Sequence, residues 1–282
     1  MSLFYLLGLL AIGATLSAFI DFGSDDDADT DDGSGPEADA TRVIGTEGDD
    51  MLTGGAGTDL LLGGGGMDVL DGGAGNDELR GGTGDDTLIG GEGNDVLLAA
   101  RGSDELSGGD GEDFLYGGVG DDDLSGDDGN DILDGGQGED TLRGGDGDDL
   151  VFGFFDSSRD GVVDANDIVD ADYLEGGDGN DIIAMGSGDI ANGGADADLF
   201  LTGVYVDGTE APLIEDFTPG EDRLGINVPD GATVFVSIAA EAGDAIVRVD
   251  GEIVARLTGV GSTLTLSDIS VLENDAVLTM VA

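Results

Sequence analysis

An apolar residue recurs at every ninth position through the first half of the chain. Leu stands there eleven times, from Leu52 to Leu142, and Val151 follows one period later. Each of these residues is the centre of a three-residue piece of the form x-Leu-x. In a short strand the central side chain points to one face and its two neighbours point to the other. The pattern therefore predicts a series of short strands whose Leu column fills a narrow core.

The other six residues of each period are rich in Gly and Asp. Twelve blocks follow one another without an insertion from Gly45 to Phe152, beginning with GTEGDDMLT and ending with GGDGDDLVF. The fourth position is Gly in every block, from Gly48 to Gly147. Because Gly permits φ > 0 and close backbone approach, these six residues are expected to form loops. The sixth position is Asp in every block: Asp50, Asp59, Asp68, Asp77, Asp86, Asp95, Asp104, Asp113, Asp122, Asp131, Asp140 and Asp149.

Stacking such loops brings carboxylates of neighbouring turns close together. Like charges at that distance repel strongly unless a cation lies between them. Calcium fits this environment because it takes six to eight oxygen ligands from carboxylates and backbone carbonyls. Magnesium fits less well, since it requires a smaller octahedral site and retains its waters. The repeat therefore predicts Ca²⁺ as the ligand of the loops.

These blocks resemble the RTX, or haemolysin-type, calcium-binding nonapeptide repeat. The resemblance implies an all-β fold, a right-handed parallel β-roll with two nonapeptides per turn and calcium between adjacent loops. It also implies that the sixth-position Asp side chains coordinate calcium with help from loop carbonyls. The seventh block departs from the pattern at Ala99 and Ala100, and the tenth block departs at Asp127. Their loops are expected to be strained or to bind calcium more weakly.

The period stops after Phe152, and residues 153–175 are interpreted as an insertion. Within it, DSSRDGVVDAND resembles a single EF-hand loop of the dockerin kind, with Gly161 at the sharp turn. The alternative is a polar loop that bulges from the roll without metal. Because only one such loop is found, docking to a cohesin-type partner is not expected. The resemblance implies these calcium ligands: Asp156, Ser158, Asp160, Val162 through its carbonyl, Asp164 and Asp167.

The repeat resumes over residues 176–201, where Asp181 and Asp198 hold the sixth position. Between them lies a shortened unit in which Asp189 is a weaker candidate ligand. In the last block Asp196 stands at the usual fourth-position Gly.

Residues 202–282 contain less Gly and more β-branched residues, and we interpret them as a small β domain that caps the roll. Asp250 and Gly251 lie between two strand-like runs, 245–249 and 252–257, which predicts a hairpin. Further strands are expected near 233–238 and 263–266. An open roll needs such a cap at its end. In RTX proteins this region also carries a type I secretion signal, which the resemblance implies here; the alternative is a cap without a role in export.

The chain begins with an uncharged apolar run from Leu3 to Ile20. As a helix it would reach about 27 Å, close to the thickness of a hydrocarbon core. Three interpretations stay open: a retained membrane anchor, a cleaved secretory signal, and a helix buried against the protein. Residues 21–43 include a run of acidic and small residues and are expected to form an extended, flexible linker. The roll is then expected over residues 44–152.

Composition excludes several classes of function. The net charge of −56 argues against nucleic acid as a partner, because such binding requires basic surface. The sequence has no Cys and no His, and its eight basic residues are all Arg. A Ser-His-Asp triad, a Cys nucleophile, a His-ligated zinc site and a Lys Schiff base are therefore excluded.

The sequence favours a non-enzymatic calcium-binding protein, secreted or on the cell surface, that folds when calcium binds. Calcium ions are its expected partners, with no nucleic acid. One alternative is an adhesin or matrix protein that attaches to a protein or glycan through residues 202–282. A second is an enzyme or toxin with an RTX tail, which we do not expect, because every regular pair of carboxylates is explained by the repeat.

Overall fold

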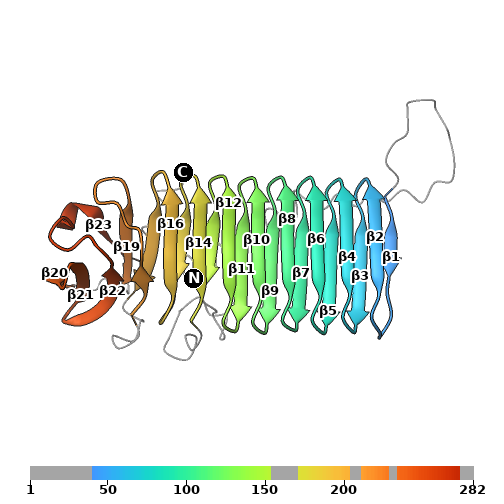
Figure 1. Cartoon of the computed structure of the whole chain (residues 1–282), viewed down its shortest axis with the longest axis horizontal. Helices are drawn as coiled ribbons and strands as arrows, with labels where there is room; N and C mark the ends of the chain where they lie inside the picture. The colour runs from blue at the N-terminus through green and yellow to red at the C-terminus, as the bar shows by residue number, and fades with distance from the viewer. Residues whose placement is uncertain (1–39, 154–170, 204–210, 229–233, 274–282) are drawn as a thin grey trace.

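The computed structural model of the protein describes residues 40–153, 171–203, 211–228 and 234–273. These residues form an elongated roll of two β-sheets along one axis, with a more irregular end at the C-terminus (Figure 1). None of their helices has the length and apolar character needed to cross a membrane. The apolar run 3–20 and the EF-hand-like residues 156–167 lie outside the described residues, so both predictions stay untested.

Successive strands alternate between two sheets. Sheet A contains, in spatial order, β1 Arg42–Ile44, β3 Leu60–Gly65, β5 Glu78–Thr83, β7 Val96–Arg101, β9 Phe114–Val119, β11 Ile132–Gln137, β13 Leu150–Gly153, β15 Ile182–Met185, β17 Leu199–Gly203, β19 Arg223–Val228 and β23 Ile269–Glu273. Sheet B contains β2 Met51–Ala56, β4 Val69–Ala74, β6 Thr87–Glu92, β8 Glu105–Asp110, β10 Asp123–Asp128, β12 Thr141–Asp146, β14 Tyr173–Asp178, β16 Ile190–Ala195, β18 Leu213–Ile214, β22 Glu252–Leu257, β21 Asp244–Val249 and β20 Val236–Glu241.

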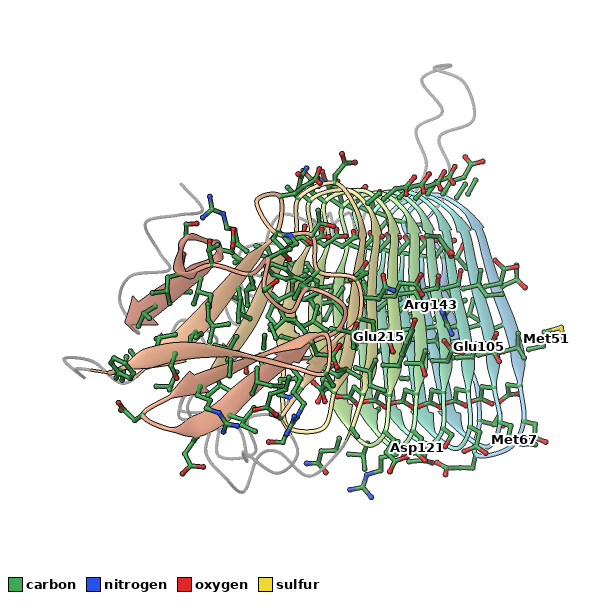
Figure 2. All side chains as sticks on the ribbon, turned by 60° about the vertical axis from the view of Figure 1, so that its left-hand side comes forward. Met51, Met67, Glu105, Asp121, Arg143 and Glu215 are labelled. Atoms are coloured by element: carbon green, nitrogen blue, oxygen red, sulfur yellow. The ribbon has the colours of Figure 1, made fainter. Side chains whose placement is uncertain are left out.

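Each turn of the roll uses two nonapeptides. Leu52 pairs with Leu70 in sheet B, and Leu61 pairs with Leu79 in sheet A, so partners in parallel strands are eighteen residues apart. This register confirms the parallel roll of two repeats per turn. Because the register is constant, equivalent side chains form straight rows along the roll (Figure 2).

The strands are longer than the apolar pattern predicts. Strand β4 runs from Val69 through Leu70 and Asp71 into Gly72, Gly73 and Ala74, which the sequence pattern assigns to a loop. The reason is that the backbone of these Gly residues joins the parallel ladder, as in the pairing of Gly73 with Gly55 and Gly91. A strand thus covers six of nine residues, and the connecting loop is only three residues long.

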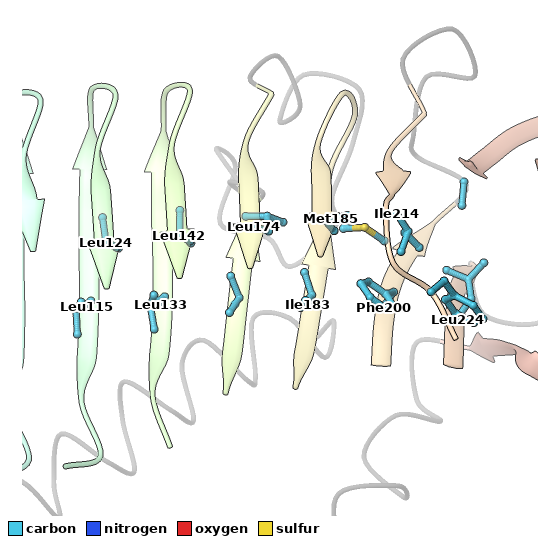
Figure 3. Close-up of a cluster of buried hydrophobic side chains, with 14 of the residues drawn as sticks. Leu115, Leu124, Leu133, Leu142, Leu174, Ile183, Met185, Phe200, Ile214 and Leu224 are labelled. Carbon is cyan, nitrogen blue, oxygen red and sulfur yellow. The ribbon is translucent and has the colours of Figure 1, made fainter. Parts of the chain in front are cut away.

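The Leu column forms the core, as predicted. Leu61, Leu70 and the other Leu residues of this column up to Leu142 are almost completely buried between the sheets. Towards the C-terminal end the core widens, and Met185, Phe200 and Ile214 take over the positions between the sheets (Figure 3).

The roll resumes earlier after the interruption than the sequence pattern predicts. Strand β14 begins at Tyr173, three residues before the predicted second array at Gly176, and pairs with β12. Leu174 and Val151 are both completely buried in the common core. The two arrays therefore form one continuous roll on either side of residues 154–170.

The C-terminal part extends the roll. Strands β19 and β23 continue sheet A in parallel, and β18 and β22 continue sheet B, so the core passes into this part without a boundary. Antiparallel pairing begins only with β22, β21 and β20. The predicted hairpin is confirmed, because Asp250 (φ 53°) and Gly251 (φ 100°) connect β21 and β22.

One predicted strand of this region is wrong. Residues 263–266 form a turn that leads into a short 3-10 helix, Leu266–Asp268, and the strand begins only at Ile269. The carboxylate of Asp268 accepts hydrogen bonds from the backbone N–H (2.8 Å) and hydroxyl (2.7 Å) of Thr265. This local capping arrangement competes with the extended conformation that β-branched residues favour.

Candidate metal centres

The sixth-position Asp residues stack into ladders along the roll. Each Asp lies directly before a strand, and its Oδ1 accepts a hydrogen bond from the backbone N–H of the Asp one turn earlier. The N–H of Asp95 donates to Oδ1 of Asp113 at 2.7 Å, and the N–H of Asp113 donates to Oδ1 of Asp131 at 2.8 Å. The Asp side chain thus ties two successive loops together.

There are two such ladders, one beside each sheet. The ladder of sheet A contains Asp59, Asp77, Asp95, Asp113, Asp131, Asp149, Asp181, Asp198 and Asp222. The ladder of sheet B contains Asp50, Asp68, Asp86, Asp104, Asp122, Asp140, Asp172 and Asp189. Every sixth-position Asp predicted from the sequence is in one of them.

The second carboxylate oxygen has no such partner in most ladder residues. It is buried, and among the described residues nothing donates a hydrogen bond to it. A buried, unpartnered carboxylate oxygen is costly, and native structures contain few of them unless a cation or water is bound there. The atoms are the Oδ2 oxygens of Asp59, Asp68, Asp77, Asp86, Asp95, Asp104, Asp113, Asp122, Asp131, Asp149 and Asp181.

A backbone carbonyl faces the same place as this oxygen. A Cβ added to Gly108 would overlap both Oδ2 of Asp113 and the carbonyl oxygen of Gly126, the equivalent Gly one turn along. The same overlap occurs at Gly54, Gly63, Gly72, Gly90, Gly117, Gly126, Gly144 and Gly176. Gly is therefore used at the first position to leave space for a carboxylate and a carbonyl oxygen.

Other loop carbonyls point along the roll axis. A Cβ on Gly111, the fourth residue of its block, would overlap the carbonyl oxygen of Gly93 in the preceding turn. Each loop thus offers hard oxygen atoms from its own Asp and from the backbone of neighbouring turns. Calcium accepts this set of ligands, since it binds carboxylates and carbonyls in variable geometry.

The calcium ligands of one site must include backbone atoms. Over the described ranges no three side chains of Asp, Glu, His or Cys gather at one point. Each candidate centre in these ranges therefore has at most two such side chains close together, so loop carbonyls are needed among its ligands. These residues fit calcium as a structural ligand of the roll.

Burial raises the pKa of the ladder carboxyls. Desolvation is the largest cause, neighbouring Asp charges add to it, and the hydrogen bond from the preceding turn opposes it in part. A cation would favour the charged form and reverse this effect. The pKa is raised to about 6 for Asp77, Asp86, Asp104, Asp131 and Asp181, to about 7 for Asp95, Asp122, Asp149 and Asp198, and to about 8 for Asp113.

The loops that depart from the repeat have the expected strained backbone. Ala100 (φ 88°), Asp127 (φ 74°) and Asp196 (φ 74°) occupy the left-handed region at positions where Gly is usual. Asp127 is held there by two hydroxyls, because Ser107 Oγ (2.6 Å) and Ser125 Oγ (2.7 Å) donate to its carboxylate. Whether these loops bind calcium more weakly stays a prediction.

The sequence pattern misses two ladder residues and gives too little weight to a third. Asp172 and Asp222 were not predicted, and Asp189 was rated a weak candidate. Asp172 accepts from the N–H of Asp140 (2.8 Å), and Asp222 accepts from that of Asp198 (3.1 Å). Neither residue is preceded by the GGxG residues of the regular blocks, so the nine-residue pattern does not identify them. The shorter signal Asp-x-Leu, present as Asp172-Tyr-Leu and Asp222-Arg-Leu, would have found them.

Three ladder positions differ in how Oδ2 is used. In the first block, Oδ2 of Asp50 accepts from the backbone N–H of Thr46 (2.6 Å) and from its hydroxyl (2.8 Å). In the shortened unit, Oδ2 of Asp189 accepts from the N–H of Gly186 (2.6 Å). At the C-terminal end of the sheet A ladder, Oδ2 of Asp222 accepts from the N–H of Thr218 (2.6 Å). Protein donors satisfy these oxygens, so the three positions are less suited to calcium than the regular loops.

Comparison with known proteins supports this description. The family described as RTX calcium-binding nonapeptide repeat matches in overlapping copies over residues 38–70, 62–97, 71–106, 90–124, 98–133, 125–153 and 169–189. The matched residues include both ladders as far as Asp189. Residues 38–153 and 169–189 are therefore RTX calcium-binding nonapeptide repeats, which bind Ca²⁺ and form a β-solenoid.

Two solved structures are similar to parts of the chain. A subunit of the mannuronan C5-epimerase from Azotobacter vinelandii is 20% identical, with a TM-score of 0.34, over 49% of this chain and 81% of the other. The extracellular lipase LipA from Serratia marcescens is 16% identical, with a TM-score of 0.28, over 84% of this chain and 40% of the lipase. The comparison with curated proteins gives no significant match.

Proposed function

We propose that this chain is a non-enzymatic extracellular protein whose roll folds when calcium binds its loops. Calcium acts here as a structural ligand rather than a catalytic cofactor. The observation that carries the proposal is the row of eleven buried Oδ2 oxygens that no described residue satisfies. Bound calcium would supply what these oxygens lack.

Electrostatics couples binding to folding. Successive ladder carboxyls belong to strands that are about 4.8 Å apart, so the ionised, metal-free ladders repel themselves. In the unfolded chain the same carboxylates are separated and solvated. Because the sites exist only in the roll, calcium binding energy becomes folding energy.

An extracellular location fits this coupling. RTX-repeat proteins are typically secreted. Extracellular calcium modules bind at roughly 10⁻⁴ to 10⁻³ M. A chain with such affinity would stay expanded at low intracellular calcium, which suits export, and would fold outside the cell.

The absence of enzymatic activity is part of the proposal. The sixth-position Asp residues of the roll are used in the ladders, where their Oδ1 oxygens bind backbone N–H groups. The sequence also lacks the His, Cys and Lys residues on which many mechanisms depend. The remaining acidic groups of the loops are largely exposed, and in the described part of the chain no three acidic side chains gather at one point.

Calcium binding by the full chain tests this proposal. Equilibrium calcium binding and resistance to a protease are measured together on the unaltered chain, on Asp113→Asn and on Asp110→Asn. Asp113 belongs to the ladder, whereas Asp110 is exposed at the third position of the same block. We expect the unaltered chain and Asp110→Asn to bind several ions and to resist protease only with calcium. Asp113→Asn should bind fewer ions. Protease resistance that is the same in calcium and in EDTA would overturn the proposal.

A further inference from the structure

The outer face of sheet A becomes apolar along the roll. Each strand presents two outward side chains, one on either side of its core residue. Over the six strands β7, β9, β11, β13, β15 and β17, eleven of these twelve side chains are apolar. We call them the sheet A stripe: Val96, Leu98, Phe114, Tyr116, Ile132, Leu150, Phe152, Ile182, Ala184, Leu199 and Leu201. The twelfth is Asp134.

The opposite face of the roll does not share this property. On the neighbouring strands of sheet B, from β6 to β16, only Ile89, Tyr173 and Ile190 of the twelve outward side chains are apolar or aromatic. The others include exposed residues such as Glu105 and Asp123. The apolar stripe is therefore not a consequence of the repeat itself, since both sheets are built from the same nonapeptide.

The stripe is packed more like a core than like a surface. Val96 is 4% exposed and Phe114 is 8% exposed, although they point away from the Leu column. Among the described elements, those in contact with β7 and β9 are their neighbours in the two sheets. Asp134 also lacks a hydrogen bond from described residues at its buried Oδ1, and burial raises its pKa to about 7.

The two ends of the stripe are closed. Before it, the outward residues of β5 are Glu78 and Arg80, which form an ion pair. At its other end, the stripe residues Ala184 and Leu201 form one buried cluster with Leu272 of β23. An occupant of the stripe would therefore lie along the roll axis between these limits.

We propose that the apolar segment 3–20 of the same chain docks on the sheet A stripe. Six strands at about 4.8 Å spacing extend over about 24 Å. Eighteen residues in a helix extend over about 27 Å. The segment carries no charged residue, so it can cover the stripe without adding to the net charge of −56. The inference goes beyond the proposed function.

The chain between segment 3–20 and the roll is long enough to allow this docking, and it favours docking of the segment over docking of a second molecule. The twenty residues 21–40 reach at most about 66 Å when extended, and they join the roll at β1, the first strand of sheet A. The eight strand spacings from β1 to β17 amount to about 38 Å. A tethered segment has a local concentration in the millimolar range. Two copies of the chain would instead bring two strongly acidic molecules together.

Single cysteines in the full, calcium-loaded chain test the docking, because the sequence contains no Cys. Ile132→Cys places a thiol in the stripe on β11, and Thr141→Cys places one at the equivalent position of sheet B on β12. We expect alkylation of Ile132→Cys to be about tenfold slower than that of Thr141→Cys. Adding Leu6→Asp and Leu10→Asp to the N-terminal segment should remove the difference.

Three results would overturn the inference. Equal alkylation of the two thiols would show that the stripe is open. Protection that depends on protein concentration and survives Leu6→Asp with Leu10→Asp would identify a second copy as the occupant. A third result would assign segment 3–20 to the membrane. In it, the chain floats with phosphatidylcholine vesicles, and the Ile132→Cys thiol is alkylated rapidly both with the vesicles and without them. Calcium binding by these variants separates failure of docking from failure of the proposed function.

Discussion

The backbone N–H of Asp95 donates a hydrogen bond of 2.7 Å to Oδ1 of Asp113, one full turn further along the roll. The other oxygen of Asp113 is buried and receives no hydrogen bond from the described residues. One carboxylate thus has two different tasks. Its Oδ1 fixes the spacing of two loops, and its Oδ2 is left for a cation.

Replacing Asp113 by Asn should weaken calcium binding without breaking the ladder. The amide oxygen can still accept from Asp95, but an NH₂ group replaces the oxygen that faces the carbonyl of Gly126. Since an NH₂ group cannot ligate calcium, we expect the calcium-loaded roll to lose about 1–3 kcal/mol of unfolding free energy, the contribution of a ligand present at roughly 10 to 100 times its Kd. Chemical denaturation in saturating calcium measures this. The exposed Asp110→Asn is the control, and an equal loss there would contradict the account.

The metal-free roll should be more stable in acid than at neutral pH. Burial raises the pKa of Asp95 to about 7 and that of Asp113 to about 8, well above the ordinary value near 4. The folded ladders therefore bind more protons than the unfolded chain between about pH 4 and pH 8. Stability without calcium is greatest below this window and is lost as pH rises through it.

Circular dichroism in EDTA at pH 4.5 and pH 7.5 measures this difference. More β-structure is expected at pH 4.5, and the calcium concentration needed for folding should fall as pH falls from 7.5 to 6, because protons bound to the ladder carboxyls stabilise the roll in place of calcium. A calcium midpoint that does not change over this range would show that protons do not stabilise the folded ladders.

Stacked loops should make the fourth-position Gly indispensable inside the roll but not at its first block. Gly111 has φ 142°, and a Cβ there would overlap the carbonyl oxygen of Gly93. Gly48 has the same position in its block, but a Cβ added there would have no atom within 4 Å. We expect Gly111→Ala to cost about 1–3 kcal/mol, as overpacking typically does. Gly48→Ala should change the melting temperature little. Equal melting temperatures of the two variants would contradict the stacking of the loops.

The two Ala residues of the seventh block should respond in opposite directions to Gly. Ala100 is exposed and has φ 88°, a conformation that costs an L-residue roughly 1–2 kcal/mol. Ala100→Gly should therefore raise the melting temperature in calcium. Ala99 is completely buried in the core. Ala99→Gly should lower the melting temperature, because it removes a buried methyl group and raises the conformational entropy of the unfolded chain. A decrease in both variants would mean that Ala100 is not strained.

The nine-residue period predicted the parts of the fold that repeat. The Leu column, the position of every sixth-position Asp and the parallel roll follow from three positions that hold over twelve blocks. Strand length did not follow, because the Gly residues look like loop residues in the sequence. Only pairing with the next turn, as for Gly73 and Gly91, draws them into the strands.

The period failed where the spacing changes. Asp172 is 32 residues after Asp140, Asp189 is 17 after Asp172, and Asp222 is 24 after Asp198. Each of these residues nevertheless continues a ladder. Whether an Asp joins a ladder depends on the backbone conformation before the strand and on a buried residue two positions later, more than on the number of residues between turns. The strand expected at 263–266 was wrong for another reason, the local hydrogen bonds between Thr265 and Asp268.

Calcium-coupled folding is the central claim, and far-UV circular dichroism of the full chain at pH 7.5 tests it most directly. Calcium is added to the metal-free chain and then removed with EDTA, and magnesium is titrated in parallel. The account predicts a cooperative and reversible change from an unfolded to a β spectrum with calcium, and no such change with magnesium at the same concentration. A β spectrum that is already complete in EDTA and does not respond to calcium would contradict it.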